Sequence, residues 1–174
     1  MRTSVDPFNS ITDADLNRIE LLIFDFDGVF TDNTVVVDSH GVESVTCWRG
    51  DGLGISRAKS LNLKMVIIST ETNSVVGHRA NKLGLPFLQA IHDKESAIIE
   101  YASKVGVSLL NVLFLGNDIN DIPGFRIVGF PVAVADASPE VFPFVRYQTQ
   151  IRGGRGAVRE ICDLIYGSRQ KLSN

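Results

Sequence analysis

The chain has few cysteines, no long apolar run and no large excess of charge of either sign. Its 174 residues include only Cys47 and Cys162, which lie far apart and outside any C-x-x-C pattern. This spacing excludes a disulfide framework and a zinc motif, and it favours two reduced thiols. The net charge of −3 gives no basic footprint for nucleic acid, and no segment approaches the roughly 20 apolar residues of a membrane span. We therefore expect neither nucleic acid nor a membrane as a partner.

The two ends of the sequence differ in composition from the part between them. Residues 1–18 lack the apolar region of a signal peptide, so we interpret them as a polar lead-in with about one helical turn and expect a cytoplasmic protein. Residues 169–174 are polar and predict a flexible tail. The segment 19–168 is long enough for a single domain with its own core.

Short runs of apolar and β-branched residues alternate with amphipathic segments between the two ends. The runs predict strands at 21–26, 64–70, 85–89, 111–116 and 130–135. The amphipathic segments predict helices at 52–62, 74–84, 93–106 and 155–167. This order predicts an α/β fold, with a doubly wound, Rossmann-like parallel sheet and helices on both of its faces.

Residues 33–48 break the alternation of strands and helices. An Asp-Ser-His-Gly turn in their middle predicts a β-hairpin that projects between the first strand and the first long helix. The hairpin carries Val35, Val37, Val42 and Val45. A valine-rich ribbon exposed to solvent needs a partner surface.

Polar residues follow three of the predicted strands where each strand ends. They are Asp25-Phe26-Asp27-Gly28, Ser69-Thr70-Glu71 and Gly116-Asn117-Asp118, and Lys94 opens the helix after the short strand. In an open parallel sheet, ligands bind beyond the carboxyl ends of the strands. Carboxylate and carbonyl oxygens suit Mg²⁺, which offsets the repulsion between the acids and admits a phosphate. The pattern predicts a site for a divalent cation and a phosphate.

Taken together, these segments resemble a known family. "DFDGVFTD", Ser69, Lys94 and "GNDINDIP" resemble the four motifs of the haloacid dehalogenase superfamily of phosphatases. "VAVADASPEV" and "GGRGAVREICDLI" resemble the C-terminal motifs of its small capless branch, the KDO (3-deoxy-D-manno-octulosonate) 8-phosphate phosphatases. The resemblance implies a capless phosphatase domain over 19–168. It also implies a homotetramer in which four hairpins form a barrel.

The resemblance also implies roles for the motif residues. Asp25 is the nucleophile, Asp27 the general acid and base, and Ser69 and Lys94 bind the phosphoryl group. Mg²⁺ is held by Asp25, by the backbone carbonyl of Asp27 and by a group of the fourth motif. Because Asn117 stands where the family usually has an acid, that group is Asn117, Asp118 or Asp121.

The substrate implied by the resemblance is a phosphorylated 2-keto-3-deoxy sugar acid. Glu71, Arg79 and Lys82 resemble the branch that acts on nine-carbon ulosonate 9-phosphates, whereas the octulosonate enzymes typically have an arginine at position 71. The segment "CWRGDGLGI" resembles a substrate loop, which adds Arg49, Asp51 and Gly52 to Thr70 as binding candidates.

Two alternatives stay open. One is a KDO 8-phosphate phosphatase. The other is a non-catalytic tetramerisation or regulatory module, because the Asn117-Asp118 pair also resembles a domain fused to N-acylneuraminate cytidylyltransferases.

Overall fold

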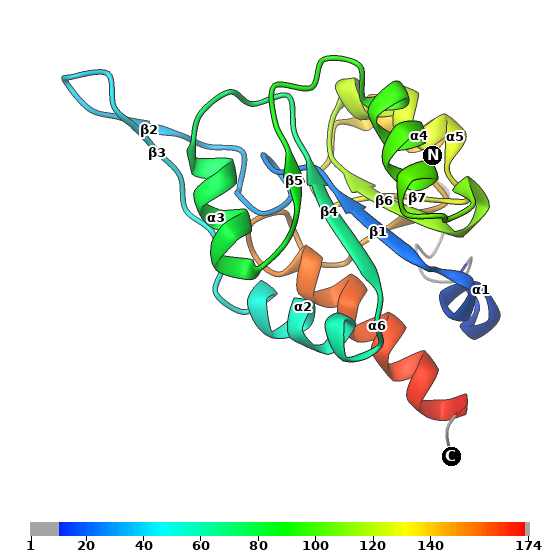
Figure 1. Cartoon of the computed structure of the whole chain (residues 1–174). Coiled ribbons are helices and arrows are strands. Elements are labelled where there is room, and N and C mark those ends of the chain that lie inside the picture. Colours follow the sequence, from blue (N-terminus) through cyan, green and yellow to red (C-terminus); the bar gives the residue numbers. More distant parts are fainter. Residues whose placement is uncertain (1–10, 173–174) are drawn as a thin grey trace, which may run out of the picture.

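A parallel sheet of six strands forms the centre of the protein, in a computed structural model that describes residues 11–172 (Figure 1). The strand order is β5-β4-β1-β6-β7-β8, and every neighbouring pair is parallel. The strands are β1 (Leu21–Phe24), β4 (Lys64–Ile68), β5 (Phe87–Leu88), β6 (Val112–Gly116), β7 (Phe130–Ala133) and β8 (Tyr147–Gln148). All four side chains of β1 are buried, as expected for a strand covered on both faces. The predicted α/β class and its five strands are confirmed, and β8 was not predicted.

Helices cover both faces of the sheet. Figure 1 shows α2 and α6 along one face and α4 and α5 on the other. The helices are α1 (Asp13–Arg18), α2 (Asp51–Ser60), α3 (Val75–Leu83), α4 (Lys94–Lys104), α5 (Ile122–Ile127) and α6 (Ala157–Leu172). Gly84 ends α3 in the left-handed conformation, the role that glycine commonly has at a helix C-terminus. The doubly wound arrangement brings the carboxyl ends of β1, β4 and β6 side by side.

The predicted hairpin is present and extends away from the sheet (Figure 1). Its strands are β2 (Val36–Val37) and β3 (Glu43–Ser44), paired antiparallel. At the turn, Asp38 Oδ1 accepts hydrogen bonds from the backbone N–H groups of His40 and Val42. The exposed fractions of Val36 and Val42 are 68% and 62%, so nothing in residues 11–172 covers the apolar ribbon.

The C-terminal helix corrects one prediction. Residues 169–172, expected in a flexible tail, continue α6 as far as Leu172, and the guanidinium of Arg169 donates to the carbonyl of Ile19. The reason is that α6 packs against α1 and α2, with Ser168 and Lys171 bonded to Asp13, and carries basic residues in its last turn, where the helix dipole favours them. Residues 173–174 lie outside the described residues, as does the lead-in before residue 11.

The last part of the lead-in forms the predicted helical turn, α1. Thr12 and Asp15 form a capping box at its start, and Leu16 is buried against the rest of the protein. None of the helices in residues 11–172 has the length and apolar character needed to cross a membrane.

Candidate active site

The carboxyl ends of β1, β4 and β6 border a cavity of about 350 Å³. Seven of the residues selected from the sequence line it: Asp25, Asp27, Ser69, Thr70, Glu71, Asn117 and Asp118. The hairpin adds a second wall, to which Val35, Glu43 and Val45 contribute. The cavity therefore lies between the sheet edge and the base of the hairpin.

Lys94 lies beneath this cavity between two carboxylates. Its Nζ is 2.8 Å from Asp25 Oδ2 and 2.5 Å from Asp121 Oδ1, and the side chains of Lys94 and Asp121 have no exposed surface. Burial acts to lower the pKa of Lys94, but the two carboxylates outweigh it and raise that pKa. The ammonium group therefore stays charged, next to the carboxylate that the sequence marks as nucleophile.

Asp25 has an unusual environment for a carboxylate. Burial, followed by repulsion from Asp121, raises its pKa to about 7, and the opposing attraction of Lys94 is the smaller effect. Its Oδ1 accepts a 2.7 Å hydrogen bond from the backbone N–H of Phe26. Both oxygens of Asp25 thus have a fixed partner, which orients the group at the end of β1.

Asp27 is held by a short network within its own loop. Thr31 Oγ1 donates to Asp27 Oδ1 at 3.1 Å, and the backbone N–H of Gly28 donates to the same Thr31 oxygen. Burial raises the pKa of Asp27, and this effect exceeds the opposite one of the hydrogen bond from Thr31, which lowers that pKa. The negative charge of Glu71 raises the pKa of Asp27 further. A carboxyl group with a raised pKa holds a proton closer to neutral pH, as a general acid requires.

The fourth motif places its three polar residues in different positions. Asp121 is fully buried, and its Oδ2 accepts hydrogen bonds from the backbone N–H groups of Asn117 (2.8 Å) and Asp118 (3.2 Å). The Asp118 carboxylate accepts from Ile119 N at the start of a short 3₁₀ turn. The Asn117 amide lies against Gly28, where a Cβ atom would be 2.0 Å from Asn117 Nδ2. Asp121 therefore holds Lys94 and the loop, while Asn117 and Asp118 face the cavity.

These residues fit Mg²⁺ by the chemistry of their donor atoms. Asp25, Asn117 and Asp118 bring carboxylate and amide oxygens to one cavity, and Mg²⁺ prefers oxygen ligands of this kind. Among residues 11–172, no three His, Cys, Asp or Glu side chains gather as a metal site.

Ser69 and Glu71 lie on the wall formed by the loop after β4. Ser69 is almost fully buried, and its Oγ accepts from the backbone N–H of Glu71 at 3.1 Å. The hydroxyl hydrogen of Ser69 is left for another acceptor, such as a phosphoryl oxygen. Glu71 Oε1 accepts from the backbone N–H groups of Thr72 and Asn73, which folds this loop back on itself.

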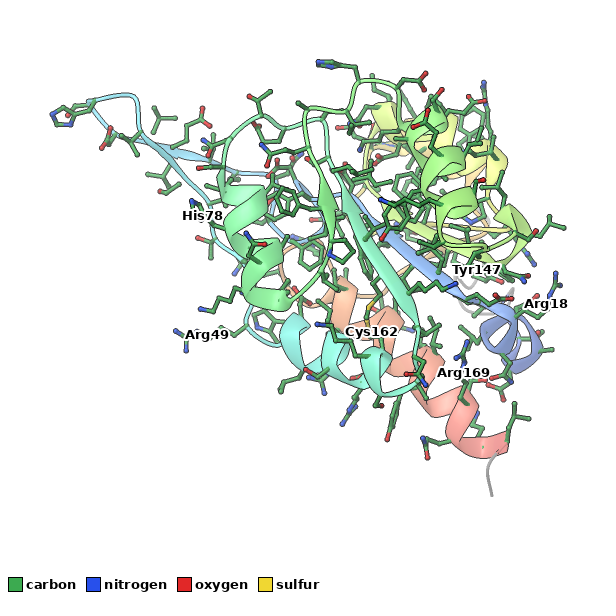
Figure 2. All side chains as sticks on the ribbon, in the orientation of Figure 1. Arg18, Arg49, His78, Tyr147, Cys162 and Arg169 are labelled. Carbon is green, nitrogen blue, oxygen red and sulfur yellow. The ribbon has the colours of Figure 1, made fainter. Side chains whose placement is uncertain are left out.

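Besides Lys94, which lies beneath the cavity, five residues selected from the sequence lie outside its lining in this chain: Arg49, Asp51, Gly52, Arg79 and Lys82. Asp51 is buried between α2 and α6, where its Oδ1 accepts from the backbone N–H of Arg159. Arg79 donates to the carbonyl of Trp48 at 2.9 Å, and Lys82 lies in the last turn of α3. Figure 2 shows Arg49 projecting outward near α2 and α3. Asp51 therefore serves the packing of α2 on α6, and Arg79 holds the segment before α2.

The structure adds residues that the sequence did not single out for this site. Thr31 orients Asp27, and Asn73 and Glu43 form part of the cavity wall. Asp121, which the sequence offered as a metal contact, is instead the second partner of Lys94. A signal existed for Thr31, because it lies four residues after Asp27 in the same loop. None existed for Glu43, whose approach to the cavity depends on how the hairpin bends.

Comparison with known proteins agrees with this geometry. A family model described as haloacid dehalogenase-like hydrolase matches residues 59–160. The 3-deoxy-D-manno-octulosonate 8-phosphate phosphatase of Escherichia coli (strain K12) is 36% identical over 173 residues, which cover 99% of this chain and 92% of that protein.

Solved structures give the same result. The phosphatase of the same name from Moraxella catarrhalis, in complex with magnesium ion, phosphate ion and a KDO molecule, has a TM-score of 0.87 and 29% identity, covering 92% of this chain and 93% of that chain. A putative haloacid dehalogenase family hydrolase from Streptomyces avermitilis has a TM-score of 0.85 and 44% identity, covering 90% and 88%. With a match over nearly its whole length, this chain belongs to the haloacid dehalogenase-like hydrolases, in the family of the 3-deoxy-D-manno-octulosonate 8-phosphate phosphatases.

Proposed function

We propose that the protein is a Mg²⁺-dependent phosphatase that hydrolyses a phosphorylated 2-keto-3-deoxy sugar acid. The observation that carries this proposal is the buried group of Asp25, Lys94 and Asp121 at the floor of the cavity. Burying an ammonium and two carboxylates costs several kcal/mol per ion before their attraction is counted. A module with a purely structural role has no need of such a group at the open end of its sheet.

The residues that would hold Mg²⁺ are Asp25, the backbone carbonyl of Asp27, and Asn117 or Asp118. When bound, the ion neutralises charge on the phosphate and on the acids around it. The related phosphatase from Moraxella catarrhalis was crystallised with a magnesium ion and a phosphate ion, which supports this part of the proposal.

The chain's own residues divide the reaction between them. The Asp25 carboxylate attacks phosphorus and forms an aspartyl-phosphate, while Asp27 gives its proton to the leaving sugar oxygen. Asp27 then takes a proton from the water that hydrolyses the intermediate. Lys94 and the Ser69 hydroxyl stabilise the charge on the phosphoryl oxygens.

The related proteins support an eight-carbon substrate over a nine-carbon one. They carry the name of KDO 8-phosphate phosphatases. The nine-carbon preference depends on Glu71, Arg79 and Lys82, and only Glu71 lines the cavity. We therefore take KDO 8-phosphate as the first substrate to test and a nine-carbon ulosonate 9-phosphate as the alternative.

Phosphate release gives the test of this function. p-Nitrophenyl phosphate, KDO 8-phosphate and a nine-carbon ulosonate 9-phosphate are compared with Mg²⁺ and with EDTA. We expect turnover with Mg²⁺ only, and a higher kcat/KM for the eight-carbon sugar acid than for the other two. The absence of turnover on all three substrates would favour the non-catalytic module related to cytidylyltransferases. A higher kcat/KM on the nine-carbon substrate would reverse the choice of sugar.

We also propose a homotetramer held together by the hairpins. Two observations support it: the exposed valines of β2 and the charge of the cavity. Among residues 11–172, Lys94 lies beneath the phosphate end of the cavity and no lysine or arginine lines its walls, although the substrate carries a carboxylate as well as a phosphate. An arginine of a neighbouring copy, such as Arg152 or Arg155, supplies the missing positive charge. Sedimentation at micromolar concentration measures the assembly, and a monomer there would contradict this proposal.

A further inference from the structure

Asn73 links three parts of the structure through its own polar atoms. Its Nδ2 donates to Glu43 Oε2 of β3 at 3.2 Å, and its backbone N–H donates to Glu71 Oε1 at 2.8 Å. Its Oδ1 accepts from the backbone N–H of Val75, the first residue of α3, at 3.1 Å. One residue therefore ties the hairpin to the loop after β4 and to a helix of the main domain.

The base of the hairpin is fixed by Val45 and Cys47, which pack against the core, whereas its outer part makes few contacts with the rest of residues 11–172. The strands β2 and β3 have two residues each, and a bridge between Thr31 and Cys47 closes the base of the hairpin. The turn at its far end is held by Asp38 from within the hairpin itself. The hydrogen bond from Asn73 to Glu43 lies between these ends, at the point where the hairpin borders the cavity.

Glu43 and Glu71 each present an unused oxygen at this wall. Both residues line the cavity, and their paired oxygens are Glu43 Oε2 and Glu71 Oε1. Within the part of the chain that the structure describes, nothing donates a hydrogen bond to Glu43 Oε1 or Glu71 Oε2. Two carboxylate oxygens thus remain available to a donor in the cavity.

The chemistry of a sugar acid decides which of its groups can lie there. Hydroxyl groups donate hydrogen bonds to carboxylates, whereas the carboxylate of the substrate is repelled by them. Hydrogen bonds to a charged acceptor are stronger than those between neutral groups. The wall therefore suits the hydroxyl-bearing carbons between the phosphate and the substrate's carboxylate.

We propose that Glu43 determines specificity by accepting a hydrogen bond from a hydroxyl of the sugar-acid chain, together with Glu71, and that Asn73 is the residue that positions Glu43. This inference rests on the proposed phosphatase function and adds to it a residue of the hairpin. It also gives the substrate a direction: phosphate over Asp25 and Lys94, hydroxyls along Glu43 and Glu71, carboxylate farthest from the floor of the cavity.

The test compares two substrates in the full-length protein with Mg²⁺. KDO 8-phosphate carries the hydroxyl chain, and p-nitrophenyl phosphate has the phosphate without it. The quantity measured is the ratio of kcat/KM for the sugar acid to kcat/KM for the aryl phosphate. Glu43→Ala removes the acceptor. Asn73→Asp keeps the acceptor for Val75 N–H, but it replaces the donor to Glu43 with a second negative charge.

We expect this ratio to fall about tenfold or more in both variants, mainly through a higher KM for KDO 8-phosphate. Glu100→Ala, at an exposed position of α4 outside the cavity, is the matched control and should leave the ratio unchanged. A ratio within twofold of wild type in Glu43→Ala overturns the inference. An equal loss on both substrates also overturns it, since Glu43 would then act at the phosphate end. If the wild type hydrolyses neither substrate, the proposed function itself is wrong.

Discussion

Replacing Asp121 by asparagine should strongly destabilise the fold. One oxygen of Asp121 accepts from Lys94 Nζ at 2.5 Å, and the other accepts from the backbone N–H groups of Asn117 and Asp118. An amide has one acceptor and one donor in place of two acceptors. Whichever way it turns, a buried donor meets either an ammonium group or two backbone N–H groups.

The size of the effect follows from burial. Removing one partner of a buried ion pair typically costs about 3–5 kcal/mol, out of a total of about 5–15 kcal/mol for a domain. Asp163→Asn is the control, because Asp163 also pairs with two cations, Arg57 and Arg159, but its side chain is 32% exposed. Exposed pairs contribute about 0–1 kcal/mol.

Urea unfolding followed by circular dichroism measures both variants against wild type. At an m-value of about 2 kcal/mol per molar, Asp121→Asn should lower the midpoint by about 2 M and Asp163→Asn by less than about 0.5 M. A loss in Asp121→Asn no larger than that in Asp163→Asn would refute the reasoning. The Lys94 group would then be held by contacts other than its two carboxylates.

Three further predictions follow from single residues of the site and its support. Asp25→Asn should abolish phosphate release and should lower the urea midpoint less than Asp121→Asn does, because burial and repulsion from Asp121 already disfavour the Asp25 carboxylate. Clear steady-state turnover of this variant would contradict the role of Asp25 as nucleophile. Gly28→Ala should raise the Mg²⁺ concentration needed for half-maximal activity, because Gly28 has φ +76° and a Cβ there would lie 2.0 Å from Asn117 Nδ2. An unchanged Mg²⁺ requirement would show that Asn117 does not bind the metal. Burial raises the pKa of Asp51 from 3.8 to about 6. Between about pH 4 and pH 6 the folded state therefore still binds a proton at Asp51 that the unfolded state has released. The contribution of Asp51 to the free energy of unfolding falls as the pH rises through this range. Asp51→Asn removes that loss and should be more stable than wild type at pH 7 by up to about 3 kcal/mol in urea unfolding; equal stability there would show that the buried carboxylate is better compensated than its contacts indicate.

The sequence by itself determined the central strands and the order of the chemistry along the chain. The apolar run 21–24 is long enough for a buried strand, and the acids that follow it fall at the strand's carboxyl end whatever the rest of the fold does. Asp25, Asp27 and Ser69 could be selected because each lies at or just after the end of a predicted strand, and Lys94 because it opens the helix that follows one. The glycine at position 84 likewise marked the end of α3 through its local backbone preference.

Several elements escaped prediction because their local signals are weak or contrary. The segment of α5, Ile122–Ile127, contains Pro123 and Gly124, which read as helix breakers, yet the proline sits in the first turn, where it costs no hydrogen bond. The strand β8 has two residues and forms by pairing with β7. The end of α6 appeared frayed from its polar residues, but packing on α1 extends it.

Only the tertiary structure decided which charged residues serve the site and which serve the packing. Asp51 and Arg79 have the residue types of a sugar-acid binding site, but their partners are the backbone groups of Arg159 and Trp48. Asp121 has the residue type of a metal ligand, but its partners are Lys94 and two backbone N–H groups. The physical reason is that helix and strand patterns depend on neighbours within a few residues, whereas the partner of a charge is set by segments that meet only when the sheet is assembled.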